Sequence, residues 1–212
     1  MSLARFIATM PPGTDPAAAA TVARDLLERW GEPHREYHTG DHLARTLSIV
    51  DANARLADDL MAVRLAAWFH DAVYDPVAAP GANEAASAAL AIQYLAILDI
   101  DEERADEVAR LVRLTAEHDP VPGDRNGCLL ADADLAILAT PWPQYQSYVD
   151  AVRAEYAHVP DDLWRVGRSA VLSNLLELPA LFRRHPEREA TARANLAREL
   201  TSLTENAIAH SS

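Results

Sequence analysis

The run Ala66-Ala67-Trp68-Phe69-His70-Asp71-Ala72-Val73-Tyr74-Asp75 joins an apolar stretch to two side chains that bind divalent metals. Apolar residues recur at helical spacing ahead of the pair and predict a helix from about 59 to 72. Consecutive residues on a helix point about 100° apart. His70 and Asp71 can therefore bind one ion only if the end of this helix faces the site.

The rest of the chain continues as amphipathic helices separated by Pro, Asp, Asn and Gly, with no convincing alternating strand and no internal repeat. The clearest break is the loop from Asp75 to Gly81, which contains Pro76 and Pro80. The other predicted helices lie at about 14–30, from about 40 onward, and at about 83–98, 101–117, 126–139, 143–157, 161–177 and 187–208. The pattern predicts an all-α bundle in a single domain over residues 1–212.

Composition narrows the range of possible functions and binding partners. The 212 residues carry 19 basic and 32 acidic side chains, a formal net charge of −13, which disfavours stable binding to nucleic acid. No apolar run approaches the length of a membrane span, and no secretory signal precedes the first helix. The single cysteine, Cys128, cannot form an internal disulfide, so we expect a cytoplasmic protein. An apolar helix face left over from the bundle would allow a homo-oligomer.

Two further segments carry side chains that can complete a metal site. His42 lies 28 residues before His70, and Asp132 and Asp134 follow about 60 residues after it. Imidazole together with carboxylate suits Mn, Fe, Co or Zn, and Mg is a further candidate. A lone buried histidine is more often a hydrogen-bonded core residue, so the metal interpretation depends on these segments meeting.

The ordered set of motifs resembles the HD-domain superfamily of metal-dependent phosphohydrolases. It is most similar to the small bacterial branch described as predicted HD-superfamily phosphohydrolases, over about residues 18–203. The motifs that carry the resemblance are Arg35-Glu36-Tyr37-His38, His70-Asp71-Ala72-Val73-Tyr74-Asp75, Asn83-Glu84 with Ser87-Ala88, Asp132-Ala133-Asp134-Leu135, Arg153-Ala154-Glu155-Tyr156 and Ala192-Arg193-Ala194-Asn195-Leu196.

The resemblance implies an all-α fold of the HD-domain type and four metal ligands: His42, His70, Asp71 and one distal aspartate. Asp132 and Asp134 are two residues apart and point to opposed sides of a helix, so one of them faces the ion. The Ala133-Asp134-Leu135 context is similar to that of the family ligand and favours Asp134. Asp132 would then hydrogen-bond a ligating histidine or cap the helix.

Four such ligands leave an octahedral ion two open positions, one for water and one for a phosphoryl oxygen. Proton transfer then needs an acid or base nearby. Glu84, which follows the proline-rich loop, is the first candidate, and Asn83-Glu84 as a helix cap with a first-turn acid is the alternative. Asp75 would orient a ligand or the water.

Substrate contacts have several candidates. Arg35, Arg153 and Arg168 offer planar guanidinium groups matched to phosphate, although each is equally suited to a salt bridge. His38 would lie beside the substrate or bond a ligand. His118 occupies a place resembling that of the extra histidines of two-metal superfamily members, and would bind a second ion, a leaving group or nothing.

The sequence therefore predicts a metal-dependent phosphohydrolase that acts on a small phosphorylated metabolite, with a nucleotide as the first candidate. One alternative is a non-catalytic module that senses a nucleotide or metal, and another is a di-iron oxygenase of HD type. A glycine-rich phosphate loop, a Gly-x-Ser-x-Gly nucleophile turn and paired zinc-binding cysteines are all missing from the sequence.

Overall fold

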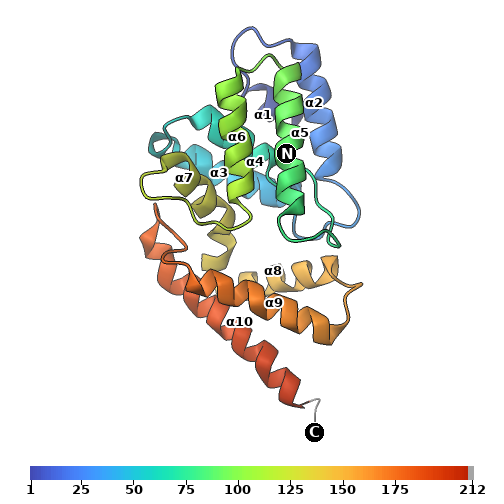
Figure 1. The fold of residues 1–212 in the computed structure, drawn as a ribbon, viewed down its shortest axis with the longest axis vertical. Helices are drawn as coiled ribbons and strands as arrows, with labels where there is room; N and C mark the ends of the chain where they lie inside the picture. Colours follow the sequence, from blue (N-terminus) through green and yellow to red (C-terminus); the bar gives the residue numbers. More distant parts are fainter. Residues whose placement is uncertain (210–212) are drawn as a thin grey trace. The chain divides into compact units, whose positions relative to one another are not determined.

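The computed structural model describes the backbone of residues 1–209 and the side chains of residues 1–205. Within this range the chain forms α-helices and short 3-10 helices and no β-strand (Figure 1), which confirms the predicted all-α fold class. The helices are α1 (Leu3–Ile7), α2 (Pro16–Arg29), α3 (Gly40–Ala52), η1 (Ala54–Leu56), α4 (Leu60–Phe69), α5 (Ala82–Ile97), α6 (Glu102–Leu114), α7 (Arg125–Asp134), η2 (Leu135–Ala139), α8 (Trp142–Glu155), α9 (Asp161–Glu177), η3 (Pro186–Arg188) and α10 (Glu189–Ala209).

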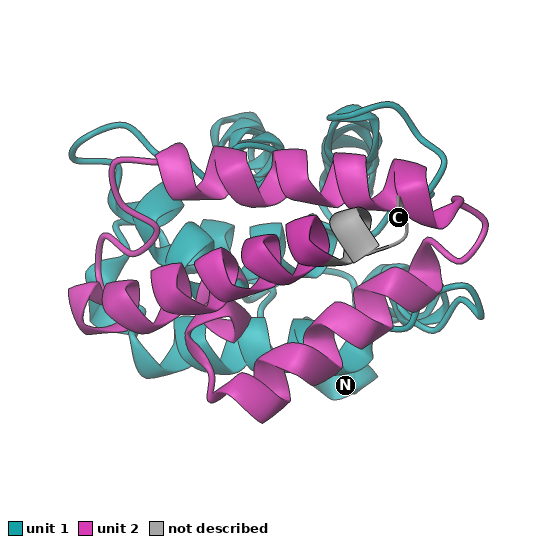
Figure 2. Cartoon of the chain, turned by 90° about the horizontal axis from the view of Figure 1, so that it is seen from below, with its two compact units in different colours: residues 1–134 teal, residues 135–212 magenta. Residues whose placement is uncertain are grey.

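The chain divides into two compact units, one ending at Asp134 and the other beginning at Leu135 (Figure 2). The first unit contains α1 to α7 and the second contains η2 to α10. Each unit has its own cluster of buried apolar side chains. The prediction of a single domain over the whole chain stays a prediction.

Side-chain caps explain where the helices begin. Asp15 accepts hydrogen bonds from the backbone N–H groups of Ala17 and Ala18 at the start of α2. Asp59 accepts one from the third residue of α4, and Thr39 accepts one from the second residue of α3. Each cap satisfies an amide at a helix start that has no carbonyl partner within its helix. The caps at Thr39 and Asp59 thus fix the start of α3, which carries His42, and the start of α4, which precedes the His70-Asp71 pair.

Helix α4 forms the centre of the first unit, where it contacts α3, α5, α6 and α7. Its residues Ala62, Val63 and 65–69 are buried. The indole N–H of Trp30 donates to the carbonyl of Trp68 over 3.0 Å, and Phe6 meets the Trp68 ring edge-on with centroids 5.2 Å apart. Close packing on all sides holds the C-terminal end of α4 in place, where the His70-Asp71 pair follows.

The second unit packs α9, η2 and η3 against α10, with α8 against η2. Its core combines apolar side chains with a buried ion pair in which Arg168 Nε donates to Glu199 Oε1 over 2.7 Å. Tyr145 also donates its hydroxyl to Glu199. The amide of Asn195 donates to the carbonyls of Leu138 and Thr140, which joins α10 to the segment after η2.

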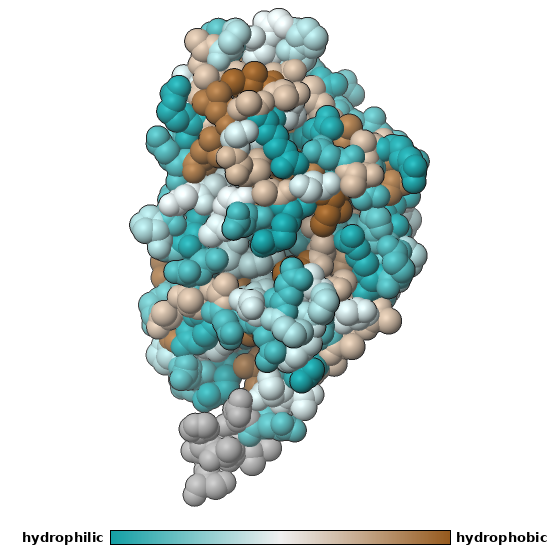
Figure 3. Space-filling model, turned by 180° about the vertical axis from the view of Figure 1, so that it is seen from behind, coloured by the Kyte–Doolittle hydropathy of each residue, from teal (hydrophilic) through white to brown (hydrophobic). Residues whose placement is uncertain are grey.

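The structure corrects two predicted boundaries and adds one short helix. The predicted helix at 59–72 ends at Phe69, so the metal-binding pair follows the helix rather than forming its last turn. The predicted helix at 126–139 is α-helical to Asp134 and then tightens to the 3-10 helix η2. The short helix α1 was not predicted. None of the described helices is long and apolar enough to cross a bilayer, and the face shown in Figure 3 intersperses hydrophobic with hydrophilic residues.

Candidate metal centre

The first turn of α3 places His42 in the interior of the first unit. Thr39 caps the helix, so His42 occupies its third position and its side chain is only 4% exposed. The Tyr37 and Trp30 rings lie 4.9 Å and 6.2 Å from the imidazole. Because aromatic rings pack around it, the orientation of this imidazole is fixed by the core.

His70 is the C-cap residue of α4, and its orientation is fixed by the helix it ends. Its Nδ1 lies 2.8 Å from the carbonyl oxygen of Ala67, one turn earlier. A carbonyl can only accept, so Nδ1 carries a proton, and Nε2 is the nitrogen that faces the other donor atoms. Trp30 packs 5.4 Å from the imidazole. A backbone bond to the non-ligating nitrogen is the usual arrangement around a metal-bound histidine.

Asp134, the last residue of α7, lies in a third segment and comes close to both histidines. Its Oδ1 lies 2.9 Å from His42 Nε2 and 3.4 Å from His70 Nε2. Its other oxygen, Oδ2, lies 2.8 Å from His118 Nε2. One carboxylate oxygen therefore faces the histidine pair while the other is held by a neighbour.

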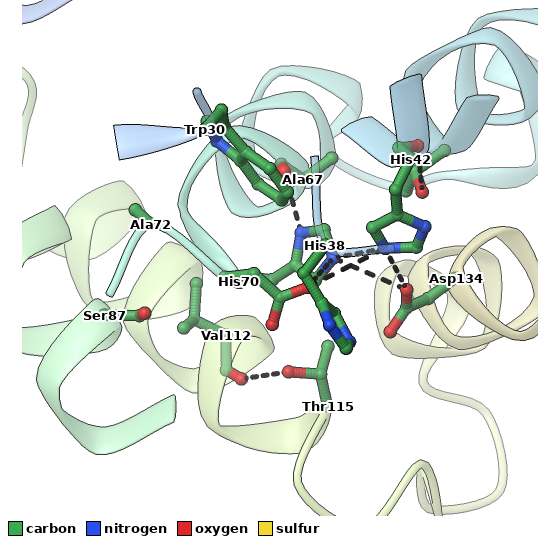
Figure 4. Close-up of polar contacts among 12 residues, drawn as sticks. Trp30, His38, His42, Ala67, His70, Ala72, Ser87, Val112, Thr115 and Asp134 are labelled. Carbon is green, nitrogen blue, oxygen red and sulfur yellow. Dashed lines mark hydrogen bonds and ion pairs between the residues drawn. The ribbon is translucent and has the colours of Figure 1, made fainter. Parts of the chain in front are cut away.

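The donor atoms are spaced as ligands of one cation are. The two Nε2 atoms of His42 and His70 are 3.0 Å apart, and Asp71 Oδ2 lies 3.1 Å from His70 Nε2 and 3.7 Å from His42 Nε2 (Figure 4). His42, His70 and Asp71 form a group able to hold a metal ion. In an octahedron with bonds of about 2.1 Å, neighbouring donors lie about 3.0 Å apart. Acceptors at these distances repel one another unless a proton or metal ion lies among them, so the residues fit a divalent cation.

The same proximity shifts the acid–base behaviour of the group. Burial favours neutral imidazole, yet the Asp71 and Asp134 carboxylates raise the pKa of His70 well above its ordinary value. Burial lowers the pKa of His42, which the Asp134 carboxylate only partly offsets. Burial alone would raise the pKa of Asp71 and of Asp134, but the charge on His70 lowers both. These directions favour ionised carboxylates and a charged His70 imidazole in the absence of a metal.

The sequence left Asp132 and Asp134 as alternatives for the fourth position, and the structure brings Asp134 to the histidines. Both residues lie on α7, and Asp132 is buried at 1% exposure. The side chain of Asp132 has a partner of its own.

Arg35 has a different place from the one predicted. Its side chain is fully buried, and its guanidinium donates to the carbonyl oxygens of His38, Asp71 and Ala72 and to the carboxylate of Glu32. These bonds occupy the guanidinium group, which a substrate phosphate would have to contact. The geometry favours a role in holding the backbone over the predicted phosphate contact.

His38 and His118 both lie beside the ligands. His38 is half-buried, with its ring stacked 4.3 Å from that of Tyr74 and 6.0 Å from that of His42. Figure 4 shows it next to His70 and Asp134. His118 bonds the Asp134 carboxylate and takes a left-handed backbone, with φ of 54°, that side chains other than glycine rarely adopt. His118 thus contacts a ligand rather than open solvent.

The two predicted catalytic carboxylates lie outside the group of donor atoms. Asp75 is exposed, and its Oδ1 accepts from the backbone of Val77, which makes it a turn residue and disfavours the predicted role beside the water. Glu84 lies half-buried in the first turn of α5. Gly81, not Asn83, is the N-cap of α5, and the Asn83 side chain instead bonds both backbone groups of Asp75.

Arg153 and Arg168 belong to the second unit, and both are engaged within it. Arg153 donates to the carbonyls of Tyr156 and Val159 and to the carboxylate of Asp161, so it ties the turn between α8 and α9. Arg168 is paired with Glu199. These bonds favour structural roles for both arginines over the predicted phosphate contacts.

A cavity of about 700 Å³ opens elsewhere in the first unit, near the start of α6. Its acidic lining includes Asp59, Asp101 and Glu107, which are paired with Arg104 or Arg110. Asn126, also in the lining, accepts from the backbone of Asp58 and Asp59. These contacts brace α4, α6 and α7, so we assign the cavity a structural role and place the functional site at the histidines.

Sequence reasoning missed the contribution of Trp30 and Tyr37. Tyr37 was quoted only as part of a motif and Trp30 was not singled out as a site residue, yet their rings pack against the candidate ligands. Periodicity predicts burial but not which buried side chain an aromatic ring will contact, so no sequence signal was available. No family model, curated protein or solved structure matches the chain.

Proposed function

We propose that this protein is a metal-dependent phosphohydrolase of HD type that acts on a small phosphorylated metabolite, with a nucleotide as the first candidate. The observation that carries the proposal is the meeting of His42, His70, Asp71 and Asp134 from three separate segments at distances that fit one cation. The ordered motifs that resemble HD-domain phosphohydrolases support it.

A divalent ion bound there would polarise a phosphoryl oxygen and make bound water a better nucleophile. The chain supplies the rest. Asp71 and Asp134 stay ionised because their pKa values are lowered, so they remain acceptors at neutral pH. His118 fixes the second oxygen of Asp134, and the Ala67 carbonyl fixes His70. His38, half-buried with its ring 6.0 Å from that of His42, is the residue that we propose to contact an anionic substrate.

The charge of the chain agrees with a small substrate. The formal net charge of −13 repels a long polyanion, whereas a bound cation is the largest local charge and can attract one phosphate group. Helix α4 and its neighbours bury the cluster, so water is excluded around most of the donor atoms. These two conditions favour a phosphorylated metabolite over nucleic acid.

The test is a screen of phosphorylated metabolites with added Mn²⁺, Fe²⁺, Co²⁺, Zn²⁺ or Mg²⁺, with phosphate release as the measurement. Asp134→Asn and Asp132→Asn form a matched pair, since each changes one carboxylate on α7, that of Asp132 buried and that of Asp134 12% exposed. We expect Asp134→Asn to abolish metal binding and hydrolysis, and Asp132→Asn to weaken them by a much smaller factor.

Other outcomes would contradict the proposal. A folded parent protein that binds no divalent ion would refute the metal centre. Saturable stabilisation by a nucleotide without product would favour the sensing module over the enzyme. Oxygen consumption by the iron-loaded protein would favour the oxygenase.

A further inference from the structure

We infer that Arg35 is a positioning residue that sets the affinity and geometry of the metal centre without touching the metal. The inference rests on the proposed function to the extent that it assumes a cation at His42, His70 and Asp71. It assigns Arg35 a role different from the phosphate contact predicted from the sequence.

The guanidinium of Arg35 makes four hydrogen bonds and one further close contact with a carboxylate. Nε donates to Glu32 Oε2 over 2.9 Å, and NH2 lies 2.9 Å from the same oxygen. NH1 donates to the carbonyls of Asp71 over 2.8 Å and His38 over 3.1 Å, and NH2 reaches the carbonyl of Ala72 at 3.5 Å. A planar fork can bind acceptors in several directions, whereas a lysine offers three donors from one nitrogen.

These acceptors belong to the two segments that carry the site. One bond goes to the segment before α3, at His38, and two go to the segment after α4, at Asp71 and Ala72. Arg35 therefore ties the backbone of a metal ligand to the backbone beside His42. A shift of Asp71 relative to His42 would break at least one of these bonds.

Arg35 also leaves the ligand carboxylate unengaged. It binds the main-chain oxygen of Asp71, while the side-chain Oδ2 faces His70 at 3.1 Å. An arginine bonded to the carboxylate itself would compete with a metal ion for its lone pairs. The arrangement holds the backbone of the ligand and keeps its donor atom available.

Aromatic rings fix the guanidinium in turn. Its central carbon lies over the Trp30 ring at 5.5 Å and over the Tyr74 ring at 5.3 Å. Trp30 packs on both ligand imidazoles, and Tyr74 stacks on His38. Arg35 is therefore part of one packed group with the rings around the donor atoms, and loosening it would move those rings.

The experiment compares Arg35→Lys with Arg168→Lys in the full chain. Arg168 is a matched control, because it is also a buried arginine with two bonds to a carboxylate, but it lies in the second unit. Both substitutions replace a buried guanidinium group by an ammonium group. Circular dichroism and thermal unfolding without metal first test whether each variant is folded. Calorimetry then gives the dissociation constant for Co²⁺, and the visible absorption of the saturated protein reports its coordination geometry.

We expect Arg35→Lys to weaken Co²⁺ binding by about 10- to 100-fold and to change the spectrum at saturation. Arg168→Lys should bind and absorb like the parent. If Arg35→Lys does not fold, Glu32→Ala provides the test, since it removes the half-exposed anchor of the fork and leaves the arginine in place. That variant should weaken Co²⁺ binding in the same direction by a smaller factor.

Parent-like affinity and spectrum in a folded Arg35→Lys, or equal losses in both lysine variants, would overturn the inference while leaving the proposed function standing. Because this experiment measures binding and not hydrolysis, a parent that binds Co²⁺ and hydrolyses no phosphate ester would refute the proposed function alone. A parent that binds no Co²⁺ would refute both.

Discussion

Metal binding at neutral pH should release one proton, and that proton should come from His70. In the metal-free protein, Nδ1 of His70 donates to Ala67, and the Asp71 and Asp134 carboxylates raise the pKa of His70 well above 6.5. Nε2 is therefore protonated at pH 7, and a cation must displace that proton to bind there. His42 has a lowered pKa and both carboxylates have lowered pKa values, so none of them contributes a second proton.

The pH dependence of metal affinity follows from the number of protons released. One displaced proton strengthens metal affinity about tenfold for each pH unit, or about 1.36 kcal/mol, from neutral pH up to the pKa of His70. Above that pKa the affinity should no longer depend on this group. Calorimetry in two buffers of different ionisation enthalpy measures the number of protons released, and a pH series gives the slope.

The control is His158→Gln, which removes an exposed histidine of the second unit and should leave the proton count unchanged. Release of no proton at pH 7 would show that His70 is neutral in the metal-free protein and would refute the reasoning. Release of two protons would show that His42 is also charged, which contradicts its lowered pKa.

Three further predictions concern stability. The free energy of unfolding of the metal-free protein should fall as the pH rises from about 6.5 through the raised pKa of His70, because the stabilising proton on His70 is fully bound only below that range. Urea titrations at several pH values measure this loss, and saturating metal should abolish it. Phe6→Ala should lower the free energy of unfolding by about 3–5 kcal/mol in the same assay, because it empties a fully buried site against Trp68, and a loss under 1 kcal/mol would contradict this packing. Gly127→Ala should lower the melting temperature, since the new methyl group would clash with the Asp124 carboxylate and the Leu114 side chain. Gly167→Ala, in the open middle of α9, should instead raise stability by about 0.5–1 kcal/mol, and equal effects of the two substitutions would count against both predictions.

Most of the fold could be predicted because the helices of this chain are long and capped. Asp15 before Pro16 marks the start of α2, as expected of an N-cap followed by proline. The five-residue α1 spans less than two turns, too few to display a periodic pattern, and it was missed for that reason. The boundary at Asp134 falls where α7 tightens into η2 without a break in the chain pattern, so nothing in the sequence marks the division into two units.

The candidate site could be predicted as a set of residue types and not as an arrangement. His42, His70, Asp71 and Asp134 stood out because imidazole and carboxylate are metal ligands in a motif order that resembles a known family. The surroundings did not stand out, because the burial of Arg35 and its bonds to backbone carbonyls depend on how distant segments pack. Sequence shows which side chain is present, whereas the acceptor it reaches is a tertiary property.

The bonds of Arg35 to main-chain oxygens have a consequence for protein engineering. A backbone carbonyl is the same group whichever side chain its residue carries, so the hold on positions 38 and 72 does not require histidine or alanine there. His38 could be exchanged for another acid, base or hydrogen-bond donor without dismantling the frame that carries Asp71. The residue beside the donor atoms is thus open to redesign, and new reactivity could be selected on a scaffold whose anchoring contacts stay constant.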